Sequence, residues 1–222
     1  MLSTDSVWNR RVADAAGEQI SHGMFNLVIG LCLVWGFGLN YVMVQVLDAE
    51  VLLSIHWLAF LIGFIGCSVV GTAIYAKSDV PAISFAGYTL VVLPLGLLMV
   101  RVLHFYDADV IAQAFLTTGL ATCGITVAAM SFPSFFLSLG RGLFIAFIVA
   151  FVAEIAMYFI TGSVPPIFDW IFVVIFSGYI GYDWVRAQMV PKTVDNAIDC
   201  AAALYVDIAI LFLRLVRIFG RR

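Results

Sequence analysis

The chain has 222 residues, of which 64% are hydrophobic and 11% are charged, and its 11 basic and 14 acidic groups give a net charge of −3. Soluble domains carry about 25% charged residues, so this composition excludes a water-soluble fold. The basic groups are too few and too scattered for a nucleic-acid-binding surface. The sequence predicts an all-α polytopic membrane protein that contacts the lipid bilayer and binds no nucleic acid.

The N-terminal residues 1–22 are polar and differ from the rest of the chain. Trp8 and Val12 recur at helical spacing with Ala15 or Ala16, which indicates a short helix on the membrane surface. A disordered tail explains the same residues equally well. No cleavable signal peptide is expected, because the first apolar stretch begins near Gly23 and is too long for one.

Residues 23–222 are predicted to form one transmembrane domain of seven helices in a compact bundle. Each span needs about 20 apolar residues, and seven of them leave no room for a separate soluble catalytic domain. The connectors are very short, so consecutive helices are antiparallel. The predicted spans are at about 23–46, 52–76, 82–104, 110–131, 141–161, 167–188 and 198–219.

The distribution of lysine and arginine predicts a cytoplasmic N-terminus, because basic residues favour the cytoplasmic connectors. They occur in the N-terminal tail and in alternate connectors, whereas the intervening connectors carry acids such as Asp169. The C-terminus disagrees, since full spanning by the seventh segment puts its arginines outside. Either this short tail crosses regardless or the last segment is re-entrant, and seven full spans are favoured. The basic residues in question are Arg10, Arg11, Lys77, Arg141, Arg186 and Lys192, and at the C-terminus Arg214, Arg217, Arg221 and Arg222.

Small residues and cysteines indicate helix packing rather than chemistry. Gly63, Gly66 or Cys67, and Gly71 form a small-residue face on the second span, and Gly178 and Gly181 do so on the sixth. The four cysteines lie far apart, which favours neither a zinc site nor a disulfide framework. The sequence contains no nucleophile–base pair, metal cluster or phosphate loop, so it predicts a protein that is not an enzyme and needs no cofactor.

Three carboxylates qualify as charges at membrane depth: Glu154, Asp183 and Asp207. A charge at membrane depth is costly and suggests a functional role. Asp183 and Asp207 flank the same connector of one helical hairpin, so their side chains can meet. Two adjoining carboxyl groups in a poorly hydrated site cannot both ionise cheaply, so they would titrate as a unit and share a proton. Ionised, they would offer the hard oxygen ligands that suit Ca²⁺.

An alternative is that each aspartate is neutralised separately. Arg186 follows Asp183 by three residues, and Arg214 follows Asp207 by seven on the same helical face. Spacing alone leaves the coupled pair and the separate ion pairs open. Glu154 has no partner in its own helix and is expected to be neutral.

Threonines of the fourth predicted span also have two alternative roles, one functional and one structural. Thr118 and Thr122, together with Glu154, would line a polar passage, although threonines of this kind more often form local hydrogen bonds and pack.

The last two spans resemble those of the Bax-inhibitor-motif family. The similarity is carried by Phe176-Ser177-Gly178-Tyr179-Ile180-Gly181-Tyr182-Asp183, by the Leu-Tyr-x-Asp pattern that begins at Leu204 and by the Leu-x-Arg-x-x-Gly pattern that begins at Leu215. Weaker similarity extends over residues 113–118 and 132–144. The resemblance implies a seven-helix fold with a central helix, and a pH-sensitive Ca²⁺ leak channel in which Asp183 and Asp207 sense protons and contact the ion.

Two positions depart from the family pattern. Bacterial relatives carry an arginine at the inner end of the second span as a latch on the aspartate pair, where this chain has Lys77. Lysine lacks the two-pronged geometry of arginine. An acidic residue of the fourth span is replaced by Gln113. Lys77, Arg186 and Arg214 are therefore the candidate latch or charge partners.

The resemblance also implies a rival function. Some bacterial members associate with membrane-bound AAA proteases, so this chain would be an accessory or regulatory subunit of a larger membrane assembly, without conduction of its own. Both readings imply a multi-pass protein of the bacterial inner membrane.

Overall fold

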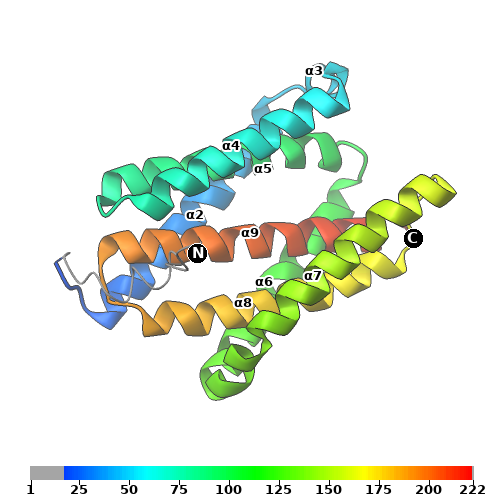
Figure 1. Cartoon of the computed structure of the whole chain (residues 1–222). Helices are drawn as coiled ribbons and strands as arrows, with labels where there is room; N and C mark the ends of the chain where they lie inside the picture. Colours follow the sequence, from blue (N-terminus) through cyan, green and yellow to red (C-terminus); the bar gives the residue numbers. More distant parts are fainter. Residues whose placement is uncertain (1–17, 222) are drawn as a thin grey trace, which may run out of the picture. The chain divides into compact units, whose positions relative to one another are not determined.

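The computed structural model describes residues 18–221, and the chain is helical over nearly all of that range (Figure 1). Most of the N-terminal segment for which a surface helix was predicted lies outside the described residues. No strand occurs between residues 18 and 221. The helices are α2 (His22–Val46), α3 (Ala49–Ser54), α4 (Trp57–Lys77), α5 (Pro81–Leu103), α6 (Ala108–Ser131), α7 (Pro133–Thr161), α8 (Ile167–Met189) and α9 (Val194–Phe219).

Six of these helices, α2 and α4 to α8, are long and apolar enough to cross a membrane. The chain is therefore a multi-pass helical membrane protein. Each predicted span corresponds to one long helix, but α9 is not among the six. Its sequence carries three aspartates and two arginines, which sets it apart from the apolar spans.

Three helix starts differ from the predicted positions, and each has a local cause. Asp48 Oδ1 accepts a hydrogen bond from the Glu50 N–H and starts the short α3, so α4 begins only after His56. Pro133, which fits the first position of a helix, starts α7 eight residues earlier than predicted. Thr193 accepts a hydrogen bond from the Asn196 N–H and starts α9 at Val194.

The described residues divide into two compact units. The first contains α2 to α5 and continues with Met189–Tyr205, and the second contains Phe105–Gln188 and the chain from Val206 onward. In the first unit, the Tyr88 hydroxyl donates to the Cys32 carbonyl at 2.8 Å, and Asn40 donates to the Tyr205 hydroxyl. The Tyr88 and Tyr205 rings meet edge to face. These contacts join α2, α5 and the first part of α9 through satisfied polar groups.

Only part of the predicted small-residue face on α4 is used for packing. A Cβ on Gly71 would lie 2.7 Å from the Gly87 carbonyl oxygen of α5, so the two backbones approach closely there. Gly63 and Gly66 have open space at the same position. The small-residue contact therefore forms at one point of α4 in this unit.

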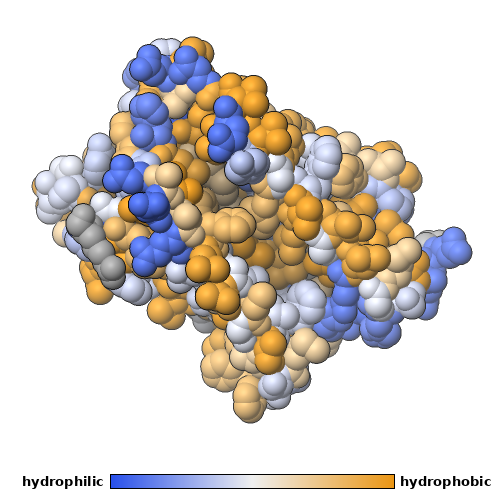
Figure 2. Space-filling view, turned by 180° about the vertical axis from the view of Figure 1, so that it is seen from behind, coloured by the Kyte–Doolittle hydropathy of each residue, from blue (hydrophilic) through white to orange (hydrophobic). Residues whose placement is uncertain are grey.

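In the second unit, α7 packs against α8 through glycines and aromatic rings. Leu143 lies over Gly178, and Phe136 lies over Gly181. The Phe147 ring meets the Phe172 ring edge to face at 6.2 Å. Outside such contacts, large hydrophobic side chains are exposed, and they cover most of the face shown in Figure 2. Lipid is the natural covering for such a surface.

Candidate functional site

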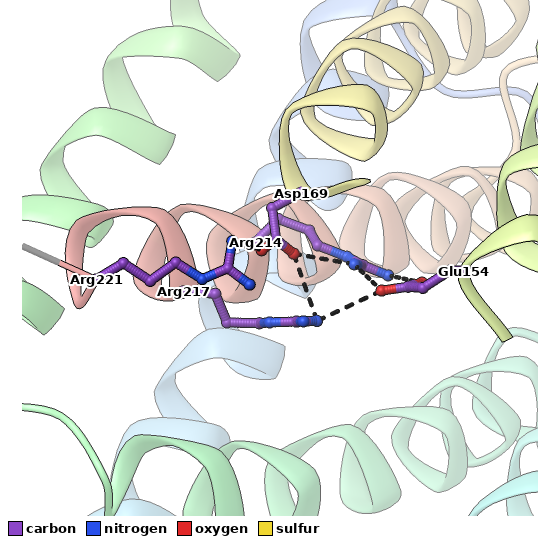
Figure 3. Close-up of polar contacts among 5 residues, drawn as sticks. All are labelled: Glu154, Asp169, Arg214, Arg217 and Arg221. Atoms are coloured by element: carbon purple, nitrogen blue, oxygen red, sulfur yellow. Dashed lines mark hydrogen bonds and ion pairs between the residues drawn. The ribbon is translucent and has the colours of Figure 1, made fainter. Parts of the chain in front are cut away.

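A cluster of five charged side chains joins α7, α8 and the C-terminal part of α9 in the second unit (Figure 3). Arg214 forms a two-pronged ion pair with Glu154, at 2.6 Å from Nη1 to Oε1 and 2.9 Å from Nη2 to Oε2. Its Nη1 also donates to Asp169 Oδ1 at 3.0 Å. Arg217 lies 3.4 Å from Asp169 and 3.7 Å from Glu154, and Arg221 lies 2.8 Å from the other Asp169 oxygen.

Three of these charged side chains are largely buried, so their charges need partners of opposite sign. The Asp169 side chain is fully buried, and those of Glu154 and Arg214 are 11% and 13% exposed. An isolated charge in such surroundings would cost several kcal/mol, whereas a two-pronged arginine–carboxylate pair is among the stronger interactions available. The Arg214 guanidinium also lies 3.9 Å from the centre of the Phe172 ring, a favourable cation–π distance.

Part of this cluster was not predicted from the sequence. Asp169 was assigned to a connector, but it lies in the first turn of α8, where an acid also complements the helix dipole. Glu154 was expected to be neutral and is instead paired with Arg214. The available signal was the spacing of Arg214, Arg217 and Arg221, which places all three on one face of a helix.

The second group is the aspartate pair. Asp183 and Asp207 lie in the same unit, and their carboxyl groups are close enough to interact directly with each other. Asp207 is buried, and its Oδ2 has no hydrogen-bond partner among the described residues. Tyr179, one turn before Asp183, is close enough to both to interact electrostatically. The structure thus brings together the two acids from neighbouring helices.

The three candidate partners of this pair, Lys77, Arg186 and Arg214, lie on three different helices. Arg214 bonds to Glu154 and Asp169 rather than to Asp207. Arg186 lies 5.1 Å from the centre of the Tyr182 ring. Lys77 is the last residue of α4 and is exposed in the first unit, whereas both aspartates belong to the second.

The two threonines proposed to line a passage also lie in the second unit, on α6. The Thr118 hydroxyl donates to the Ala114 carbonyl at 2.7 Å, which is the local hydrogen bond typical of threonine in helices. Thr122 Oγ1 is buried and has no hydrogen-bond partner in the described part of the chain.

Lys192, in the connector between α8 and α9, combines polar and aromatic contacts. Its Nζ donates to the Val190 carbonyl at 3.0 Å and lies 4.6 Å from the centre of the Phe25 ring. Partial burial lowers the pKa of the Lys192 amine below its usual value. Residues 18–221 contain no group of three or more His, Cys, Asp or Glu side chains that could hold a metal ion.

Comparison with known proteins gives a family match and several relatives. The family described as "Inhibitor of apoptosis-promoting Bax1" matches residues 18–222. A Campylobacter jejuni protein is 34% identical over 110 residues, 49% of this chain and 47% of that protein. Protein lifeguard 4 of Mus musculus is 27% identical over 123 residues, which are 55% of this chain and 51% of that protein. The Golgi anti-apoptotic protein of vaccinia virus is 27% identical over 124 residues, which are 55% of this chain and 52% of that protein. The chain thus spans about half the length of the curated relatives that it matches.

Proposed function

Because this chain belongs to the family of inhibitors of apoptosis-promoting Bax1, we propose that it is a pH-sensitive cation leak channel in which Asp183 and Asp207 sense protons. Ca²⁺ is the transported ion in this proposal. The observation that carries it is the close approach of the two carboxyl groups, which interact directly with each other. An ionised carboxylate can only accept hydrogen bonds, so in this proposal the two groups share a hydrogen bond when one of them holds a proton.

Loss of that proton changes the electrostatics of the site. Two negative charges would then lie side by side on α8 and α9, in surroundings that hydrate them poorly. The cost is relieved if the carboxyl groups move apart or if a cation binds between them. Asp207 Oδ2, which is buried without a hydrogen-bond partner among the described residues, supports the second route, because Ca²⁺ prefers oxygen ligands. Both routes link pH to cation movement.

The other candidate residues have supporting roles in this proposal. Arg186 acts as a basic partner of the ionised pair, and the hydroxyls of Thr118 and Thr122 line the passage. Glu154 contributes through its ion pair with Arg214, which fixes α9 against α7.

The test is Ca²⁺ flux into liposomes that contain the purified full chain, measured between pH 6 and pH 8 as typical assay limits around the neutral range. Asp207→Asn and Asp183→Asn are expected to abolish most of the pH dependence, because the asparagine amide does not titrate. Asp79→Asn is the matched control, since Asp79 is an exposed acid of the α4–α5 connector. An Asp207→Asn channel with the flux and pH response of the unmodified chain would rule out the proposal.

A second candidate function is that of an accessory or regulatory subunit in a larger membrane assembly, such as one built around a membrane-bound AAA protease. The supporting observation is that α4 and α7 bury little of their apolar surface in the structure. Purification in mild detergent separates the two proposals. A stoichiometric protein partner, together with no flux from the isolated chain, would favour the subunit.

A further inference from the structure

The charged cluster on α7, α8 and α9 is not electrically balanced. It contains three guanidinium groups, on Arg214, Arg217 and Arg221, and two carboxylates, on Glu154 and Asp169, which leaves one positive charge in excess (Figure 3). A net charge in a partly buried site is costly unless a counter-ion is available. Among the described residues of the cluster, no further acid supplies the balancing negative charge.

The excess charge lies on the accessible side of the cluster. The side chains of Arg217 and Arg221 are 30% and 34% exposed, whereas Arg214 is mostly buried and uses both Nη atoms on Glu154. Arg217 is 3.4 Å or more from each acid, which is longer than an ordinary hydrogen bond. Arg221 contacts Asp169 Oδ2, but that oxygen has no partner with hydrogen-bond geometry in the described part of the chain. Both arginines thus keep N–H donors for another acceptor.

The surroundings indicate where this acceptor lies. The cluster is at the end of the helices where α8 begins and α9 stops, since Asp169 is in the first turn of α8 and Arg221 follows the end of α9. Trp170, next to Asp169, is 52% exposed. Tryptophan is enriched at the level of the lipid headgroups. We therefore expect Arg217 and Arg221 to lie near the level of the lipid headgroups, where phosphate groups are abundant.

Two further acids lie in the same unit near the end of α9. Asp107 and Asp109 are at the start of α6, and the neighbouring Tyr106 packs against Gly220. Both acids are exposed to solvent, and neither comes within ion-pair distance of Arg217 or Arg221 among the described residues. They do not neutralise the cluster.

We infer that Arg217 and Arg221 form a binding site for a phosphate group, either that of an anionic lipid headgroup or free phosphate. Arginine matches phosphate oxygens through paired N–H donors. Asp169 contacts the guanidinium groups of Arg217 and Arg221 and so positions them. Arg214 in turn fixes Asp169 through its hydrogen bond. This inference does not depend on the proposed channel activity.

The test is a titration of the delipidated full chain in neutral detergent, with bound lipid counted by native mass spectrometry. The probes are phosphatidylglycerol, phosphatidylcholine as the zwitterionic comparison, and inorganic phosphate as a competitor. We expect phosphatidylglycerol to bind the unmodified chain, and R217Q/R221Q to bind it about tenfold more weakly or worse, as expected for lost hydrogen bonds to a charged group. R141Q, which removes an exposed arginine from α7, should bind like the unmodified chain.

A second variant protects the test against misfolding. R217K/R221K keeps both positive charges but not the paired donors, so its affinity should fall between those of the unmodified chain and R217Q/R221Q. Competition by inorganic phosphate would identify free phosphate as a ligand of the site, and binding without competition would identify the lipid headgroup. Equal affinity of the unmodified chain and R217Q/R221Q, or an equal loss in R141Q, would overturn the inference.

Discussion

Glu154 of α7 and Arg214 of α9 are sixty residues apart in the chain and form a two-pronged ion pair with both contacts under 3 Å. Glu154→Gln removes the negative charge but keeps the size of the side chain. Because the Arg214 charge would then be buried with only Asp169 beside it, we expect the free energy of unfolding to fall by about 3 kcal/mol. Chemical denaturation in detergent micelles measures this change.

A double-mutant cycle separates this pair from general damage. E154Q/R214Q should cost less than the sum of the two single variants, with a coupling of about 0.5–3 kcal/mol for side chains in contact. Glu50→Gln is the matched control, because Glu50 is exposed in the first turn of α3, and its effect should stay within about 0.5 kcal/mol. Additive single effects would show that the pair does not act as a unit.

Gly36 of α2 allows a second prediction. A Cβ at this position would lie 2.9 Å from the Tyr205 ring and closer still to the Tyr88 hydroxyl. Gly36→Ala should therefore destabilise the first unit by about 1–3 kcal/mol, the usual range for overpacking. Gly38, two residues on in the same helix, has nothing within 4 Å of the same position. Gly38→Ala should be neutral or slightly stabilising, and equal melting temperatures for the two variants would contradict the prediction.

The positions of the long helices follow from the sequence because apolar runs in lipid have few alternatives to a helix. Their starts are less predictable, since they depend on single residues such as Pro133 and Thr193, whose capping roles compete with a continuing apolar pattern. The meeting of Asp183 and Asp207 could be anticipated from their shared hairpin. The partner of Arg214 could not, because Glu154 lies on a helix whose packing angle no local pattern reveals.

The burial of Asp169 could not be predicted from the sequence for a different reason. In the sequence it follows a proline-containing connector and was counted among the acids of the connectors, yet it is fully buried. Its burial is possible only because three arginines reach it from the end of α9, more than forty residues later in the chain. Long-range ion pairs of this kind leave no periodic signal at the acidic position.

Lys192 gives a prediction on pH. Burial lowers the pKa of its amine in the folded protein, so between that value and about 10.4 the unfolded chain binds the extra proton. The free energy of unfolding should therefore rise with pH across this window, and Lys192→Met should remove that contribution.

The amine itself can be titrated, because Lys77 is the other lysine of the chain. In a Lys77→Arg chain, the rate of Lys192 acylation should reach half its maximum at a lower pH when the protein is folded than when it is denatured. Peptide mass spectrometry separates the modified lysine from the terminal amine. A folded midpoint at or above the denatured one would contradict the lowered pKa.

The arginines at the end of α9 also bear on topology. Basic residues retain connectors in the cytoplasm when they are free charges, but Arg214, Arg217 and Arg221 all contact Asp169. We therefore expect the end of α9 to lie on the same side of the membrane as the α7–α8 connector. In a chain with its native cysteines replaced, Ser163→Cys and Phe219→Cys, the latter at the last residue of α9, should react with an impermeant maleimide from one side. Met189→Cys, at the other end of α8, should react from the opposite side. Labelling of Phe219→Cys together with Met189→Cys would instead indicate that α9 re-enters the membrane without crossing it.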